Sequence, residues 1–404
     1  MSEAKLPLEG VRVVEVATWI AAPVAATILG DLGADVIKVE PPGEGDPYRA
    51  LTSGPGFEPC DVNYTWMMDA RGKRSVALDL KNERCREALL RLVEACDVFI
   101  TNQPHPIRQK FGLRYEDLAP RNERMIYASL TAFGEKGPER DRPGFDQVAY
   151  WARSGLLDLV RAPGAPPVQG LPGMGDHPTG VALYAAILTA LFRRERTGKG
   201  GHVQTSLLAN GFWSNGCLGQ GGLAGLGYDA RREAPVEPGP MSSLHTLYEC
   251  SCGGTLQLNM VRTEAEIEAL YGVLGLGELL EDPRFAADEG RFENGAVLVE
   301  RFRALFARAP LAEWLERLEA AGVPASHMAR VEDLARDEQA IVNGVLLDGR
   351  AAGVGMDWII NHPVGVDGLT RGATKAPELD EHGEEVLCEL GYSPEEIAEI
   401  RSGS

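Results

Sequence analysis

The sequence predicts an α/β protein in which a large domain, built around a parallel sheet, carries a smaller inserted α+β domain. Three observations favour this fold. The chain has 404 residues, which is too many for one compact core. Short apolar, β-branched runs alternate with helix-length segments as far as residue 130. Between residues 241 and 335 helical patterns dominate instead, and short strands return after residue 339.

The first part of the chain contains two β-α-β patterns. The first helix has Pro23 in its first turn and stops at Gly33, and Asn82 is suited to cap the second helix. The strands are expected, in order, at residues 11–16, 35–39, 75–80, 98–100 and 125–130. Such alternation implies a parallel sheet that is covered by helices on both faces.

The next segment adds helices and one strand to this domain. A helix, a Pro/Gly-rich loop, a long helix and a strand are expected at residues 145–160, 162–175, 181–194 and 202–207. Glycine is dense at 216–227 and residues 235–240 are rich in turn formers, which indicates a change of domain. We therefore expect the large domain's first part at 1–215 and a linker at 216–240.

The small domain is expected at residues 241–335 and differs in kind. A hairpin around a Gly-Gly turn should occupy 246–258, and Thr263 with Glu266 forms the sequence signature of a capping box. Helices are expected at 263–275, 291–308, 311–321 and, near the end of the chain, 381–390. Residues 336–404 should then return to complete the large domain.

Composition excludes several classes of function. The formal net charge of −19 repels nucleic acid and anionic membranes, so an anionic ligand would need a local basic cluster. No apolar run approaches the roughly 20 residues that span a bilayer, and no signal peptide is evident, so we expect a cytoplasmic protein. The seven cysteines are scattered, and Cys250 and Cys252 fit a hairpin better than half a zinc site. We expect no metal.

Glu40 lies where dinucleotide-binding proteins place an acidic residue that binds ribose. The turn before it, at residues 17–23, has no G-x-G-x-x-G pattern. Without those glycines the backbone cannot approach a pyrophosphate, so the sequence argues against a dinucleotide site. Gly30 and Gly33 are better explained by helix packing and a helix stop.

The segment Gly-Met-Gly-Asp-His-Pro-Thr-Gly at 173–180 lies directly before the predicted long helix. Glycines allow a ligand to approach closely, and the helix dipole keeps an acid at this end ionised. Asp176 is thus a candidate carboxylate nucleophile. Alternatively, Asp176 or Thr179 could simply cap the helix. Spacing alone leaves both interpretations open.

Six blocks of sequence give the chain a family resemblance. In order along the chain they are residues 8–15, 32–40, 72–75, 175–180, 196–200 and 381–387. Together they resemble the class III CoA-transferases, the family of formyl-CoA, carnitine, phenyllactate and 2-hydroxyisocaproate CoA-transferases. The resemblance implies a Rossmann-like large domain, an interlocked homodimer, and coenzyme A as a substrate with no permanently bound cofactor.

In this family an aspartate attacks an acyl-CoA thioester to give a mixed anhydride and then an aspartyl-CoA thioester. The resemblance places that role on Asp176. It also implies that Asn102 and Lys110 contact the CoA nucleotide, and that Ile20, which lies where formyl-CoA transferase has a glutamine, contributes to the CoA site. Two basic clusters at predicted sheet edges could bind the phosphates, although solvated surface charge is the alternative: Arg71, Lys73 and Arg74, and Arg108, Lys110 and Arg114.

The chain also departs from its relatives. Family members that racemise 2-methylacyl-CoA use a histidine where this sequence has Phe145, which cannot transfer a proton. Residues 238–240 are Pro-Gly-Pro in place of the flexible tetraglycine loop of formyl-CoA transferase. Trp19 and Phe145 match positions near the acyl pocket, which favours an apolar acid, and His177 could orient the site.

These residues predict transfer of CoA from an acyl-CoA to a carboxylic acid. Within enzymes, the alternatives are a 2-methylacyl-CoA racemase and an intramolecular transferase that acts on one diacid. Outside enzymes, the alternatives are a non-catalytic subunit of a heteromeric transferase and a nucleotide-binding regulatory module. The sequence identifies neither the donor nor the acceptor.

Overall fold

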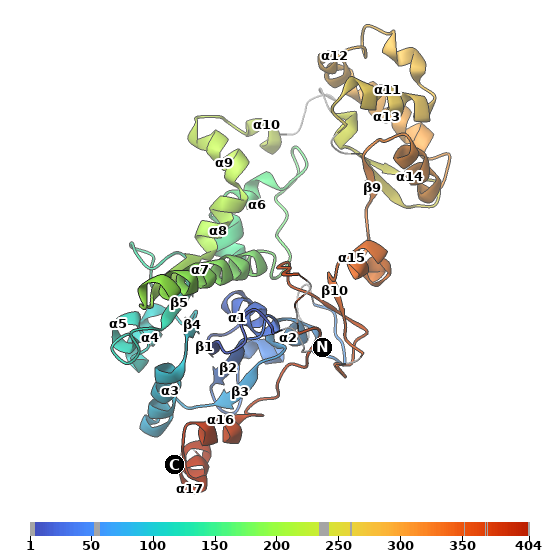
Figure 1. The fold of residues 1–404 in the computed structure, drawn as a ribbon. Helices are drawn as coiled ribbons and strands as arrows, with labels where there is room; N and C mark the ends of the chain where they lie inside the picture. Colours follow the sequence, from blue (N-terminus) through green and yellow to red (C-terminus); the bar gives the residue numbers. More distant parts are fainter. Residues whose placement is uncertain are drawn as a thin grey trace. The chain divides into compact units, whose positions relative to one another are not determined.

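The computed structural model describes residues 5–51, 57–233, 242–258, 261–350, 352–367, 369 and 371–402 (Figure 1). The chain forms two compact units. The larger unit comprises Met1–Ala162, Pro166–Tyr228 and Glu338–Ser404, and the smaller comprises Pro163–Ala165 and Asp229–Asp337. Both ends of the chain therefore contribute to the larger unit. Residues 238–240, which were compared with the tetraglycine loop, lie outside the described residues.

A six-stranded parallel sheet organises the larger unit. Its strand order is β3-β2-β1-β4-β5-β6. The strands are β1 (Arg12–Val16), β2 (Asp35–Glu40), β3 (Arg74–Ala77), β4 (Val98–Thr101), β5 (Ile126–Thr131) and β6 (Gly201–Ser206). This is the doubly wound order of Rossmann folds, in which the direction of winding reverses between β1 and β4. The predicted α/β class is confirmed.

Helices cover both faces of this sheet, as the alternation predicted. Val13 contributes to a core shared with α1 (Ala21–Asp31) and α7 (Asp176–Thr197). Its neighbour Val14 points to the other face, where α3 (Glu83–Ala95), α16 (Gly383–Glu389) and α17 (Pro394–Ser402) pack. The C-terminal helices α16 and α17 thus pack against the same sheet that contains β1, near the start of the chain (Figure 1).

The smaller unit has a hydrophobic core of its own, which includes Tyr248 and Phe302. An antiparallel sheet contains β7 (Leu247–Glu249), β8 (Thr255–Leu258) and β9 (Ala325–His327). Its helices include α11 (Glu264–Leu274), α12 (Asp288–Glu293), α13 (Gly295–Phe306) and α14 (Leu311–Ala320). A break at Asn294 divides the single helix expected at 291–308.

Two helices of the larger unit differ from the sequence prediction. The segment predicted as one helix at 145–160 forms a π-helix, η2 (Gln147–Ala152), followed by α6 (Leu156–Leu159). Helix α7 begins at Asp176 and not at residue 181, because Pro178 is tolerated in a first turn. Asp176 is therefore the first residue of the helix.

Shorter elements complete the larger unit. They are η1 (Pro47–Ala50), α2 (Tyr64–Ala70), α4 (His105–Phe111), α5 (Tyr115–Leu118), α8 (Leu207–Ser214), α9 (Gly216–Leu223), α15 (Glu338–Val342), β10 (Leu346–Asp348) and β11 (Trp358–Ile360). No helix in the described part of the chain is both long enough and apolar enough to cross a membrane.

Candidate active site

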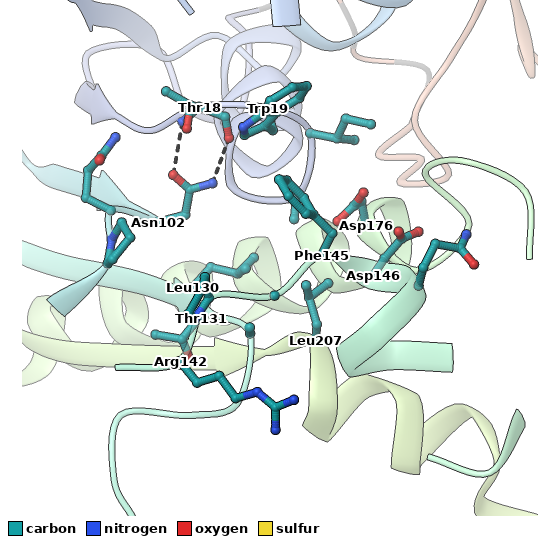
Figure 2. A pocket seen from close by; sticks show the side chains of 18 of the residues that line it. Thr18, Trp19, Asn102, Leu130, Thr131, Arg142, Phe145, Asp146, Asp176 and Leu207 are labelled. Carbon is teal, nitrogen blue, oxygen red and sulfur yellow. Dashed lines mark hydrogen bonds between the residues drawn. The ribbon is translucent and has the colours of Figure 1, made fainter. Parts of the chain in front are cut away.

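A cavity of about 520 Å³ opens at the carboxyl ends of the central strands (Figure 2). Ligands of doubly wound sheets bind at this edge, where the winding direction reverses. The turn after β1, the segment after β4 and the end of β5 all line the cavity. Lining residues include Thr18, Trp19, Ile20, Asn102, Leu130, Thr131, Arg142, Phe145, Asp146, Gly173, Asp176 and Leu207.

The turn after β1 is held from two sides. The Asn102 side chain accepts a hydrogen bond from the Thr18 amide at 3.0 Å and donates one to the Thr18 carbonyl at 2.6 Å (Figure 2). Trp19 has a positive φ of 66°, which is strained for a residue with a side chain, and its amide donates to Asp46 at 3.0 Å. These bonds fix Trp19 at the cavity, where its ring meets Phe145 edge-on at 5.5 Å between centroids.

Asp176 occupies the first position of α7 and lines the same cavity. Neither of the two predicted caps is formed. No side chain caps the first amides of α7, and the Thr179 hydroxyl donates to the Gly175 carbonyl at 2.7 Å. Among the described residues the Asp176 carboxylate has no hydrogen-bond partner. It remains available to a ligand.

The surroundings of Asp176 make its ionisation adjustable. Burial raises the pKa of Asp176 to about 7, the Asp146 carboxylate adds to this rise, and His177 opposes it. Asp146 lies beside Asp176 in the cavity (Figure 2). Burial also raises the pKa of Asp146, although hydrogen bonds from backbone amides, including that of Gly175, oppose the rise. Two carboxyl groups with raised pKa values therefore share one cavity.

His177 directly follows Asp176 in the sequence, and its ring nitrogens contact Asp69 and Gly173. Its Nε2 lies 3.1 Å from Oδ1 of Asp69, and its Nδ1 lies 2.9 Å from the Gly173 carbonyl. The Tyr48 hydroxyl donates to the other Asp69 oxygen at 2.7 Å. Burial alone would lower the pKa of His177, but the hydrogen bond and charge of Asp69 raise it.

Comparison with known proteins identifies the family. Residues 8–383 match the family model described as CoA-transferase family III. The chain belongs to this family. Its cavity at the sheet edge, with an acid at the start of α7, is therefore found in a CoA-transferase, which moves CoA between acyl-CoA and acids.

Similar CoA-transferases cover nearly the whole chain. An (R)-2-hydroxy-4-methylpentanoate CoA-transferase of Clostridioides difficile is 34% identical, over 96% of this chain and 97% of that protein. A cinnamoyl-CoA:phenyllactate CoA-transferase of Clostridium sporogenes is 31% identical, over 97% and 95%. The crystal structure of a CAIB/BAIF family protein from Brucella suis has a TM-score of 0.82 at 32% identity, covering 96% of this chain and 100% of that one.

The cavity at the sheet edge brings together residues that lie far apart in the sequence. Of the predicted site residues, the cavity is lined by Trp19, Ile20, Asn102, Phe145 and Asp176. His177 lies next to Asp176 in the sequence but lines a second cavity, which Asp176 does not line. The individual roles of these residues stay predictions.

Most of the predicted phosphate-binding cations lie elsewhere and already have partners. Arg71 is buried against Asp31, with its Nη2 2.7 Å from Oδ2. Lys73 is fully buried against Glu15 at 2.8 Å. Arg108 pairs with Glu135, and Arg74 pairs with Asp35, Glu385 and Glu389.

These four cations are therefore neutralised by the protein itself, and their assignment to CoA phosphates has no support in this arrangement. Lys110 differs because it is exposed on α4, where its Nζ lies 5.2 Å from the centre of the Phe111 ring. The sequence could show the clusters of positive charge but not the acids that pair with them.

Sequence reasoning missed three carboxyl groups that define the site. Asp46 fixes the turn at Trp19, Asp69 binds His177, and Asp146 shares the cavity with Asp176. Asp146 was within reach, because it directly follows Phe145 in a segment that the family resemblance already singled out. No group of three or more potential metal ligands occurs among the described residues.

Proposed function

We propose that this CoA-transferase works through a covalent aspartyl-CoA thioester at Asp176. The observation that supports this proposal is the Asp176 carboxylate itself. It lies at a helix N-terminus, faces a cavity at the reversal point of the sheet, and has no hydrogen-bond partner among the described residues. A structural acid would be expected to cap the helix or pair with a cation.

In the proposed reaction Asp176 attacks the thioester carbonyl of the donor. The C–S bond breaks, CoA leaves as a thiolate, and a mixed anhydride remains. The thiolate then attacks the aspartyl carbonyl, which releases the free acid and leaves the aspartyl-CoA thioester. An acceptor carboxylate reverses these two steps and leaves as the new acyl-CoA.

Each attack creates an oxyanion that needs hydrogen-bond donors. The first turn of α1 can supply them, because no side chain caps its amides and Ile20 and Ala21 line the cavity. The turn after β1 is fixed by Asn102 and Asp46, so these amides are held in place before the substrate arrives.

We infer that the transferred acids are apolar. Around the carboxylate the cavity wall contains aromatic and aliphatic side chains, notably Trp19, Phe145, Leu130 and Leu207. Such a wall stabilises a hydrocarbon chain or ring better than it stabilises formate or oxalate. The relatives named for 4-methylpentanoate and phenyllactate derivatives agree with this class, whereas the relative named for oxalate does not.

We also propose an interlocked homodimer in the cytoplasm. Large apolar side chains are exposed on α7 and α8, including Phe192 and Phe212, and Trp213 is 85% exposed. Exposed apolar groups of this size on one unit favour association. Analytical ultracentrifugation should give a dimer of about twice 43.6 kDa, and a monomer at micromolar concentration would contradict the proposal.

Trapping the intermediate tests the catalytic proposal. The protein is incubated with an apolar acyl-CoA and then with hydroxylamine, which should convert Asp176 to a hydroxamate in the peptide that contains His177. Asp176→Ala should retain less than about a hundredth of the transfer rate. A hydroxamate on Asp146, or an active Asp176→Ala variant, would refute Asp176 as the nucleophile.

A further inference from the structure

We propose that Asp69 holds His177 as an imidazolium, and that this pair favours the ionised form of the Asp176 carboxylate in its cavity. The inference rests on the proposed role of Asp176 as nucleophile. It assigns His177 and Asp69 as positioning residues, which act on the charge of Asp176 without touching the substrate.

The first argument is the hydrogen bonding of the His177 ring. Both ring nitrogens face oxygen acceptors, Nδ1 the Gly173 carbonyl at 2.9 Å and Nε2 the Asp69 carboxylate at 3.1 Å. A neutral imidazole has one N–H group and could satisfy only one of these contacts. The doubly protonated ring satisfies both, so the geometry favours the imidazolium.

The second argument is the way in which Asp69 is held. Its side chain is only 3% exposed, and the Tyr48 hydroxyl donates to the oxygen that His177 does not contact. Lys73, which directly precedes β3, binds the backbone carbonyl of Asp69 at 3.0 Å and pairs with Glu15. His177 is therefore the cation that directly pairs with the Asp69 carboxylate.

The third argument is the balance of charge around Asp176. Asp146, at the start of η2, and Asp69, on α2, both disfavour its ionised form. Of the charged groups that act on Asp176 in the described part of the chain, His177 alone favours ionisation. Without the imidazolium the half-buried carboxylate would have two acidic neighbours and no opposing cation, so more of it would be protonated at neutral pH, and the protonated acid is not a nucleophile.

The pair acts from outside the substrate cavity. Asp69 and His177 line a second cavity of about 650 Å³, which does not include Asp176, whereas Asp176 lines the first. The effect on the nucleophile is therefore electrostatic, which predicts a change in pH dependence and little change in the binding of acyl-CoA.

Three variants test the pair: His177→Gln, Asp69→Asn and, as a matched control, His327→Gln. His327 is exposed on β9 in the smaller unit. The rate of aspartyl-CoA formation is measured in single turnovers between about pH 5.5 and 9. The native rate should rise with pH through about 7, the value to which burial raises the pKa of Asp176.

His177→Gln should move this rise upward by about one pH unit, which makes the reaction about tenfold slower at low pH and nearly native at high pH. Asp69→Asn should move it less, because losing Asp69 also removes a negative charge that disfavours ionised Asp176. The control should keep the native profile, and KM for acyl-CoA should change less than about twofold in all three variants.

Nitrogen NMR of the labelled histidines provides the second measurement. The chain has seven histidines, and the signal missing from His177→Gln identifies His177. Both ring nitrogens of His177 should be protonated at neutral pH in the native protein, and one should lose its proton in Asp69→Asn.

A neutral His177 in the native protein would overturn the proposal, and so would an equal loss of rate at every pH. Failure of the nucleophile assignment gives a different pattern. In that case Asp176→Ala would stay active while the NMR result for His177 stayed as expected.

Discussion

Two groups of ionisable side chains flank the turn after β1, and they differ in their balance of charge. In the first group two lysines meet two carboxylates. Lys38 lies 2.6 Å from Glu15 and 2.9 Å from Asp46, and Lys73 lies 2.8 Å from Glu15. All four side chains are fully buried. Burial alone would lower the pKa of Lys38, but the neighbouring carboxylates raise it. Burial lowers the pKa of Lys73, although Glu15 opposes this shift. The lysines and the carboxylates of the group are nevertheless equal in number.

The second group has three carboxylic acids and one imidazole. Asp69 is paired with His177, whereas Asp146 and Asp176 face the cavity without a cation of their own. The raised pKa of both acids follows from this surplus of acids together with burial. A balanced buried group has one stable protonation state, but an unbalanced group can change its state when a ligand or the pH changes.

This difference in charge balance separates the group that supports the turn from the group that lies at the cavity. The balanced group lies beneath the turn and supports it, because the Asp46 carboxylate that pairs with Lys38 also accepts the Trp19 amide. The unbalanced group lies at the cavity and contains the candidate nucleophile. The two groups differ in burial as well as in charge balance, because the side chains of the first are fully buried whereas that of His177 is 35% exposed. The charge balance can be changed in each group by a single substitution.

The largest effect is expected from breaking the balanced group. Lys38→Met would leave Glu15 and Asp46 buried with one lysine fewer, which should reduce the free energy of unfolding by about 3–5 kcal/mol. Urea unfolding measures this loss. The matched control, Lys199→Met, removes an exposed lysine and should change stability by less than about 0.5 kcal/mol. Equal effects of the two substitutions would contradict the comparison.

Removing an acid from the unbalanced group should increase the free energy of unfolding. The pKa of Asp176 is about 7 in the folded protein and about 3.9 in the unfolded chain. As pH rises between these values the unfolded state ionises first, so Asp176 increasingly destabilises the fold. Asp176→Asn should therefore stabilise the protein, and the gain should grow by about 2–3 kcal/mol between about pH 5 and 8.

Melting curves of the variant and the native protein at each pH measure this gain. Asp61→Asn is the control, because Asp61 is exposed and should show no such growth. A gain that is constant with pH would mean that the Asp176 carboxylate has an ordinary pKa, which would also remove the reason for a compensating His177.

Local patterns in the sequence predicted much of the fold. The expected cap at Asn82 is confirmed by its bond from the Arg84 amide at 2.8 Å, and the capping box of Thr263 and Glu266 is present. Such signals depend on neighbours within four residues, which a sequence displays directly. The early start of α7 was not predicted, because Gly173, Gly175 and Pro178 are residues typical of a loop.

At the site, the sequence could not predict which residues pair when they lie far apart in the chain. Asp31 and Arg71 are 40 residues apart, and His177 and Asp69 are 108 apart. No local pattern links such residues, so the basic clusters were expected to face a ligand and Asp69 was overlooked. Family resemblance compensated for this only where a motif was continuous, as around Asp176.

A smaller effect, on KM for acyl-CoA, should distinguish the exposed Lys110 from Arg74, which is paired with acids. Lys110→Ala should raise KM for acyl-CoA by an amount equivalent to about 1–2 kcal/mol with little change in kcat, if the exposed ammonium contacts the nucleotide. Arg74→Ala should leave KM nearly unchanged, because its guanidinium already binds Asp35 and Glu389, and should lower stability instead. Steady-state kinetics with acyl-CoA and with an acyl-pantetheine, which lacks the nucleotide, provide the measurement.

The outcomes for the two cations separate the hypotheses. A rise in KM for Lys110→Ala that also occurs with the pantetheine thioester would place Lys110 away from the nucleotide. A rise for Arg74→Ala that is confined to acyl-CoA would support the assignment of Arg74 to CoA that the sequence predicted, and would require the ion pairs of Arg74 to open when the substrate binds.

The last prediction is that the enzyme leaves the α-carbon of its substrate unchanged. A racemase must remove the α-hydrogen and return it through two proton carriers, and the position of one of them holds Phe145, which faces Trp19 across the cavity. Transfer through Asp176 forms and breaks bonds only at carbonyl carbon and sulfur. A chiral 2-methylacyl-CoA incubated in deuterated water should therefore keep its configuration and gain no deuterium, while CoA passes to an added apolar acid. Mass spectrometry and chiral chromatography follow both products in one reaction. Deuterium uptake without transfer would make the unbalanced acids of the cavity proton carriers and identify the chain as a racemase.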